Sequence, residues 1–167
     1  MAEIKKKKRV QSKAKGNRVE LEIAKVLNDR FNLDNGFTRV PYSGAFSTNN
    51  RIYKDTRVEA LDVLSGDLIC PKNFKFSIEV KSRADFNFWD MLNNDNENTD
   101  IDSWIYQASH DASCTHKEPL LVIKINNKKP FVLFPKKLFE GKVIYKEFTL
   151  MRFDYFLLLD DEFFWEK

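Results

Sequence analysis

The stretch from Leu64 to Arg83 constrains the fold of this chain most, because it reads as two short apolar runs joined by a turn. In the second run apolar residues occupy every second position: Phe74, Phe76, Ile78 and Val80. A period of two predicts a β-strand with one apolar and one polar face, and it places Glu79 and Lys81 next to each other on the polar face. Asp67 ends the first run, where a tight turn would bring it close to this strand.

Asp67, Glu79 and Lys81 are residue types from which a hydrolytic metal site can be built. Carboxylate oxygens bind a hard cation such as Mg²⁺, and an ammonium group can orient water or offset the charge that builds on a phosphate. The alternative is a solvated polar face, which is common for a Glu-x-Lys pattern on a half-buried strand. The nearby Asp67 favours the metal site.

A helix is predicted for residues 18–31, where apolar side chains recur at helical spacing. At about 100° per residue, Glu20 falls inside the apolar arc and Glu22 falls outside it. Since a carboxylate that faces a core is costly unless it is paired or bound to metal, Glu20 is a candidate site residue and Glu22 a surface residue. The alternative is that Glu20 lies at the edge of the stripe and reaches water.

The N-terminal segment is strongly basic, although the net charge of the 167-residue chain is only +3. Residues 1–18 contain one acid, Glu3, and these basic residues: Lys5, Lys6, Lys7, Lys8, Arg9, Lys13, Lys15 and Arg18. We expect residues 1–15 to form a disordered basic arm and residues 16–167 a single domain. Such an arm suits binding to a phosphate backbone, and the alternative is a solvated or localisation-type tail.

The remaining elements are predicted in this order: a strand at Phe37–Val40, a polar loop at 41–50, a strand near Leu61, a helix from Thr99 or Asp100 to about Ala112, strands at Pro119–Ile125 and Phe131–Pro135, and a strand with a short packed segment in Val143–Trp165. The aromatic residues 163–165 would close the core or form a dimer surface, and core closure is favoured.

Cysteine content and hydropathy indicate a cytoplasmic protein. Cys70 and Cys114 do not make a disulfide framework, so both are expected to be reduced, with Cys70 in the core. No apolar run approaches the roughly 20 residues that span a bilayer, and no apolar segment of a secretory signal follows the basic N-terminus.

Five motifs in this order resemble the PD-(D/E)xK nuclease superfamily, and most closely its archaeal-type Holliday junction resolvases, which also occur in viruses. The matching residues are Lys15-Gly16-Asn17-Arg18-Val19-Glu20, Gly36-Phe37-Thr38-Arg39-Val40-Pro41-Tyr42-Ser43-Gly44, Asp67, Glu79-Val80-Lys81-Ser82 and Gln107-Ala108. The resemblance covers about residues 13–135. Gly66 stands where the family has Pro, and the segment between the Ser-Gly loop and Asp67 is longer than in the family.

The resemblance implies an α/β, restriction-endonuclease-like fold: a mixed central β-sheet flanked by helices, with the site at one sheet edge. It implies Mg²⁺, with Mn²⁺ as a substitute, and no small-molecule cofactor. The implied metal ligands are Glu20, Asp67, Glu79 and the Val80 carbonyl. Lys81 would position the attacking water, Gln107 would orient Lys81 or the water, and Ser43 would touch the phosphate near the cut.

The implied partner is branched duplex DNA, bound by a homodimer whose two sites make paired nicks. The expected DNA contacts are the basic residues of the N-terminal segment together with Arg39, Ser43 and Arg83. Other readings stay open: a restriction-, nick- or flap-directed nuclease of the same superfamily, or a DNA-binding protein that kept the fold and lost catalysis. A ribonuclease is a weaker reading, because the sequence shows no aromatic platform for RNA bases.

Overall fold

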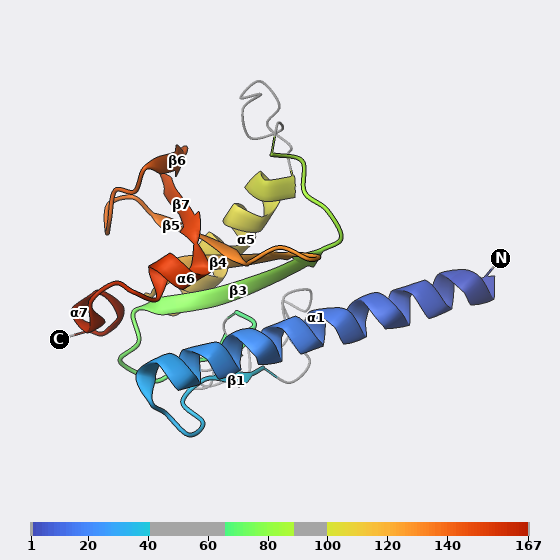
Figure 1. Ribbon diagram of the computed structural model, residues 1–167, viewed down its shortest axis with the longest axis horizontal. Coiled ribbons are helices and arrows are strands. Elements are labelled where there is room, and N and C mark those ends of the chain that lie inside the picture. The colour runs from blue at the N-terminus through green and yellow to red at the C-terminus, as the bar shows by residue number, and fades with distance from the viewer. Residues whose placement is uncertain (1, 41–65, 89–99, 167) are drawn as a thin grey trace.

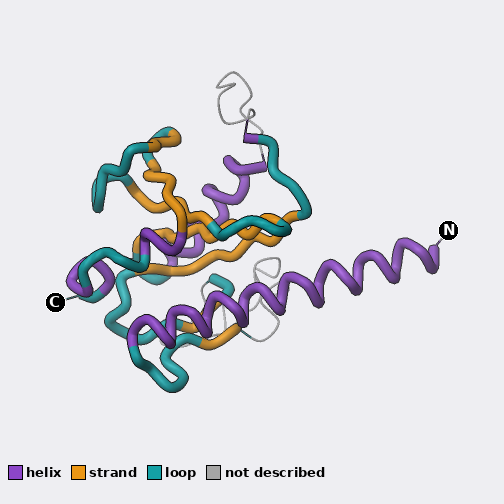
Figure 2. Tube along the Cα trace, in the orientation of Figure 1, coloured by secondary structure: helices purple, strands orange, loops and turns teal. Residues whose placement is uncertain are grey.

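A five-stranded sheet lies between two helices in the computed structural model, which describes residues 2–40, 66–88 and 100–166 (Figures 1 and 2). Helix α1 (Ala2–Phe31) packs on one face and helix α5 (Asp100–Cys114) on the other. Each face is apolar because alternate residues of a strand point to opposite sides, so each needs its own cover. No helix in these described ranges is both long and apolar enough to cross a membrane.

The sheet is mixed, which confirms the predicted fold class. Its strand order is β3 (Phe76–Arg83), β4 (Glu118–Ile125), β5 (Phe131–Pro135), β7 (Phe148–Arg152) and β6 (Val143–Tyr145). Strands β3 and β4 are parallel, and α5 forms the crossover between them, whereas the other neighbours are antiparallel. Strand β3 therefore lies at one edge of the sheet, next to only one ladder partner.

A small antiparallel pair, β1 (Thr38–Arg39) and β2 (Leu68–Ile69), covers the outer edge of β3. The backbone N–H of Asp67 donates to the Ile78 carbonyl at 2.8 Å, and the N–H of Val40 donates to the Asp67 carbonyl at 2.9 Å. Asp67 thus precedes a strand and does not end one, which differs from the sequence prediction. The strand predicted near Leu61 lies outside the described residues.

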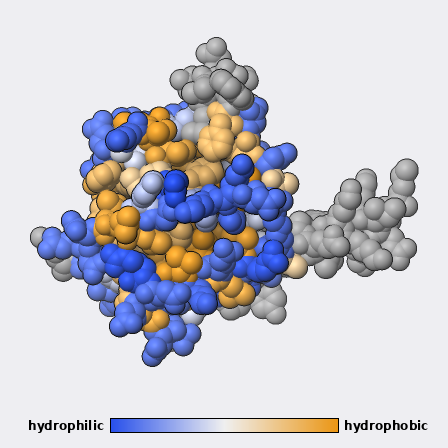
Figure 3. Space-filling model, in the orientation of Figure 1, coloured by the Kyte–Doolittle hydropathy of each residue, from blue (hydrophilic) through white to orange (hydrophobic). Residues whose placement is uncertain are grey.

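The C-terminal segment closes the core beneath the sheet. Helices α6 (Phe153–Phe156) and α7 (Asp161–Phe164) pack with α1 and β3 in one hydrophobic cluster, and Phe164 is fully buried. In the view of Figure 3, hydrophobic residues gather between hydrophilic bands where α1, β3 and α6 come together. The prediction of core closure by the aromatic residues near the chain end is confirmed.

Helix α1 is longer than the sequence indicated. It begins at Ala2 and not at Arg18, so the segment expected to be a disordered arm is the first half of a 30-residue helix. Lys, Arg, Gln and Ala are good helix formers and the segment has no proline, so local propensity permits this extension. The buried face lies in the second half, where Val19, Ile23 and Leu27 meet the sheet.

The two cysteines are free and should differ in reactivity. Burial raises the pKa of the half-buried Cys70 thiol to about 12, so only about 10⁻⁴ of it would be thiolate at pH 8, whereas Cys114 is exposed. We expect a thiol reagent at pH 8 to label one cysteine quickly in the native protein and two in denaturant. Cys114→Ser should remove the fast reaction, and fast labelling that survives this change would contradict the burial of Cys70.

Candidate active site

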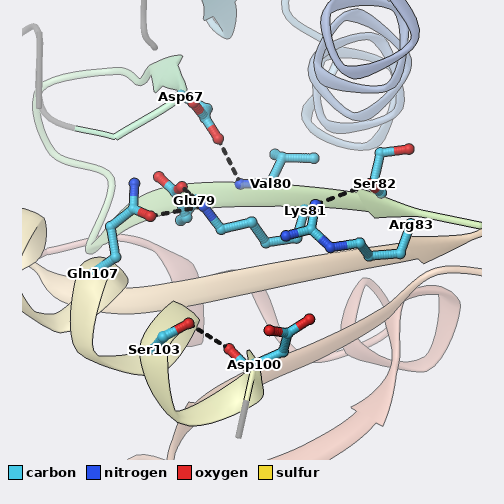
Figure 4. A network of polar contacts seen from close by, with 9 residues as sticks. All are labelled: Asp67, Glu79, Val80, Lys81, Ser82, Arg83, Asp100, Ser103 and Gln107. Atoms are coloured by element: carbon cyan, nitrogen blue, oxygen red, sulfur yellow. Dashed lines mark hydrogen bonds and ion pairs between the residues drawn. The ribbon is translucent and has the colours of Figure 1, made fainter. Parts of the chain in front are cut away.

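Asp67 and Glu79 lie near each other at the edge of β3 that faces β2, and Figure 4 shows how they lie. The Asp67 carboxylate accepts a hydrogen bond from the backbone N–H of Val80 at 2.8 Å. In a strand the N–H and C=O of one residue point to the same side. The Val80 carbonyl therefore lies on the same edge as the Asp67 side chain, which is the arrangement expected if both are metal ligands.

Gly66 allows the chain to approach β3 so closely. Its φ is +83°, in the left-handed region that favours glycine, and a Cβ placed there would lie 2.6 Å from the Ile78 carbonyl oxygen. This geometry explains why a glycine can stand where the resembled family has proline: it lets the next residue, Asp67, bond to the backbone of β3.

Lys81 connects Glu79 of β3 to Gln107 of helix α5. Its Nζ donates to Glu79 Oε1 at 2.5 Å and to Gln107 Oε1 at 2.8 Å. Only 3% of the Glu79 side chain and 16% of the Lys81 side chain are exposed. Two acceptors in a largely desolvated setting fix the ammonium group in place. The contact between Gln107 and Lys81 is consistent with the predicted role of Gln107 in orienting Lys81.

Glu20 lies on the α1 side of the same edge and is buried, as the helical wheel predicted, whereas Glu22 is exposed. Arg39 of β1 donates from Nε to Glu20 Oε2 at 2.5 Å and also binds the side chain of Asn17 at 2.9 Å. Arg39 was expected among the residues that contact DNA. In the structure Arg39 holds Glu20 in position. A contact between Arg39 and DNA stays a prediction.

Burial and the neighbouring Asp67 raise the pKa of two acids at this edge. Burial and then the charge of Asp67 raise the pKa of Glu79 to about 8, although Lys81 acts in the opposite direction. Burial and Asp67 also raise the pKa of Glu20, against the lowering effect of Arg39. The raised pKa values mean that the ionised forms of Glu20 and Glu79 are disfavoured at this edge unless a further cation is bound.

Asp111 is a member of this group that the sequence did not reveal. Burial raises its pKa, and its carboxylate interacts electrostatically with Asp67, Lys81 and His110. It follows Gln107 by four residues on α5, so the two side chains share one face of the helix one turn apart. That spacing was the available signal, since the resemblance had already selected Gln107.

A divalent cation fits the chemistry of this edge, with Asp67, Glu79 and the Val80 carbonyl as oxygen donors. A bound cation would favour the ionised forms of these desolvated carboxyl groups. Across residues 2–40, 66–88 and 100–166, however, no group of three or more acidic, His or Cys side chains is arranged to hold a metal. Glu20 is bound to Arg39, so its direct contact with a metal stays a prediction.

The structure describes only some of the other residues that were predicted to contact DNA. Ser43 lies outside the described residues, as do the side chains of Lys5, Lys6, Lys7, Lys8, Arg9 and Lys13. Arg18 is exposed. Lys15 donates to the Arg83 carbonyl at 3.4 Å, and the Arg83 guanidinium lies 4.6 Å from the ring centre of Trp104. The first contact places Lys15 of α1 next to the end of β3, and the second joins that end to α5.

Comparison with known proteins gives one result. The family described as "Phage putative PDDEXK endonuclease" matches residues 11–160, which include all the described site residues. No curated protein and no solved structure matches the chain.

Proposed function

Because the chain belongs to the PDDEXK family of phage endonucleases, we propose that it cuts DNA by metal-assisted phosphodiester hydrolysis and that its substrate is the four-way junction. Membership makes it a nuclease of the PD-(D/E)xK superfamily. Mg²⁺ as the metal, with Mn²⁺ as a substitute, and the branched substrate belong to the proposal.

One observation carries the proposal: Asp67, from the turn before β2, lies at the edge of β3 beside the Glu79–Lys81 pair. Asp67 is fixed by the Val80 N–H and Glu79 by Lys81. Two desolvated carboxylates with only one ordered ammonium group reduce the stability of the fold. Such a cluster is expected where a bound cation compensates the charge. A protein that only bound DNA would have no need for it.

Each residue takes a role from its position. Asp67, Glu79 and the Val80 carbonyl would hold the cation, which when bound would lower the pKa of a water and neutralise charge on the phosphate. Lys81 would position the attacking water and stabilise the pentavalent phosphorane through Nζ, whose direction Gln107 sets. Glu20, held by Arg39, would orient a water, and Ser43 would contact the phosphate next to the cut.

Binding and assembly follow the resemblance. The basic residues of α1, with Arg83, would contact the phosphate backbone without reading sequence. A homodimer would place two sites about a two-fold axis, as two symmetric nicks require. The protein would work in the cytoplasm, or in the host cytoplasm if it is encoded by a phage.

Cleavage of end-labelled DNA tests the proposal. A four-way junction, a flap, a nicked duplex and a linear duplex of matched length would be incubated with the protein and Mg²⁺, Mn²⁺ or EDTA. We expect paired symmetric nicks with 5′-phosphate ends in the junction, slower cutting of the other forms, and no cutting in EDTA.

Other results would change the proposed substrate or contradict the proposed mechanism. Faster cutting of the flap, nicked or linear form would replace the junction by that form and leave the chemistry intact. Cutting that persists in EDTA, or binding with no cutting of any DNA form, would contradict the metal-assisted mechanism.

A further inference from the structure

A cavity of about 660 Å³ opens beyond the C-terminal end of β3, outside the catalytic edge. Three phenylalanine rings, Phe86, Phe88 and Phe131, line it with ring centres 4.8 to 6.0 Å apart. Ile125 and Leu150 complete an apolar floor. Half of Phe88 is exposed, which leaves part of its aromatic surface open to a ligand.

Cations surround this apolar floor. Lys128, Lys129 and Arg152 line the cavity, and exposed Arg83 precedes its first lining residue, Ala84. Asp154 pairs with both Lys129 and Arg152, and Asp85 also lines the cavity, so part of this charge is already offset. Lys128 has no such carboxylate partner among the described residues, so its charge is available to a ligand in the cavity.

Aromatic rings bordered by cations are the recurring means by which proteins hold unpaired nucleotides, since every base has a π-face to stack and every nucleotide a phosphate to pair. A cavity of this volume has the size of a small-ligand site, large enough for a base. A base within a duplex could not reach the rings, because its faces are covered by its neighbours.

The cavity also lies close to Lys81 of the candidate active site. Lys81 and Ala84 are three residues apart on or just after β3, which at about 3.3 Å per residue is roughly 10 Å. With a rise of about 3.4 Å per nucleotide in a strand, that corresponds to about three nucleotides.

We propose that the cavity formed by Phe86, Phe88 and Phe131 binds an unpaired DNA base a few nucleotides from the cut phosphate. The inference rests on the proposed nuclease function and sharpens its substrate: DNA with a single-stranded segment or an openable branch point next to the scissile bond. A fully paired linear duplex would then bind only through its backbone.

Fluorescence anisotropy in EDTA, where no cutting occurs, tests the inference with three labelled DNAs: oligo(dT), a duplex with a single-stranded tail, and a blunt duplex. The variant is Phe88→Ala, which removes a half-exposed ring and should leave the fold intact. We expect its dissociation constant to rise at least about fivefold for oligo(dT) and the tailed duplex, the lower end for loss of one base–aromatic stack, and to stay within about twofold for blunt duplex.

Two further variants serve as controls for Phe88→Ala. Phe139→Ala removes another exposed ring, 40% accessible and outside the cavity, and should change none of the three constants. Phe88→Trp keeps an aromatic face and should restore binding. Unchanged binding of oligo(dT) by Phe88→Ala, or an equal loss for blunt duplex, would overturn the inference.

Two further outcomes would assign the cavity to another occupant and so overturn the inference: tighter binding of oligo(U) than of oligo(dT) that depends on Phe88, or a lower sedimentation mass of Phe88→Ala in the absence of DNA. Failure here is separable from failure of the nuclease proposal. Wild-type protein that nicks junction DNA with Mg²⁺ while Phe88→Ala binds all DNAs normally would leave the catalytic proposal standing.

Discussion

Asp67→Asn should reduce metal-dependent DNA cleavage by at least about 100-fold, the range seen when one preorganised charge-stabilising group is removed from an active site. The amide oxygen can still accept the hydrogen bond from the Val80 N–H, so the local backbone should be preserved. What changes is the negative charge that a cation would bind. The measurement is single-turnover cleavage of junction DNA in Mg²⁺, together with the dissociation constant in EDTA, which we expect to stay within a few-fold of wild type.

Asp29→Asn is the matched control, because Asp29 is an exposed acid on the same protein, on α1, and its change removes the same charge. It should leave the cleavage rate unchanged. Lys81→Ala should lower the rate by a comparable factor, about 10² to 10³. It also removes the cation beside buried Glu79, so its thermal stability must be measured alongside. Near-wild-type cleavage by Asp67→Asn would contradict the catalytic assignment.

The convergence of the site could be predicted from sequence because strand periodicity fixes side-chain direction. Glu79 and Lys81 share a face by the period of two, and the 2.5 Å contact between them follows from it. The helical wheel placed Glu20 inward for the same kind of reason, and its burial confirms this. Local geometry of this sort does not depend on the rest of the fold.

The partners of these residues could not be predicted, because they depend on tertiary packing. Arg39 was expected among the DNA contacts, and only the docking of β1 against α1 brings it to Glu20. Asp111 required knowledge of which face of α5 meets β3. Asp67 was expected at the end of a strand, and the left-handed turn at Gly66 places it before one.

The phenylalanine cavity shows the same limit in a different way. Phe86 and Phe88 follow β3 directly, whereas Phe131 is more than 40 residues later. No local pattern joins these three residues, so an aromatic platform could not be predicted from the sequence. The parallel pairing of β3 with β4, followed by the tight turn into β5, is what brings the three rings together.

Phe164→Ala should lower the free energy of unfolding by about 3–5 kcal/mol, the range for a fully buried phenylalanine replaced by alanine. Its side chain has no exposed surface and contacts the rings of Phe31, Phe156 and Phe163 at centre distances of 5.0 to 5.3 Å. Removing it would leave a cavity between α1 and α7 that these rigid rings could fill only in part. Urea unfolding followed by intrinsic fluorescence measures the loss.

Leu158→Ala is the control, because Leu158 is 77% exposed and its loss should change the free energy of unfolding by less than about 0.5 kcal/mol. If Phe164→Ala does not fold, Phe164→Leu keeps most of the volume and should show a smaller loss in the same direction. If the loss of unfolding free energy depended on protein concentration, Phe164 would lie in a subunit interface, because association shifts apparent stability by mass action. A concentration-independent loss is what core closure within one chain requires, because the cavity then exists in the monomer itself.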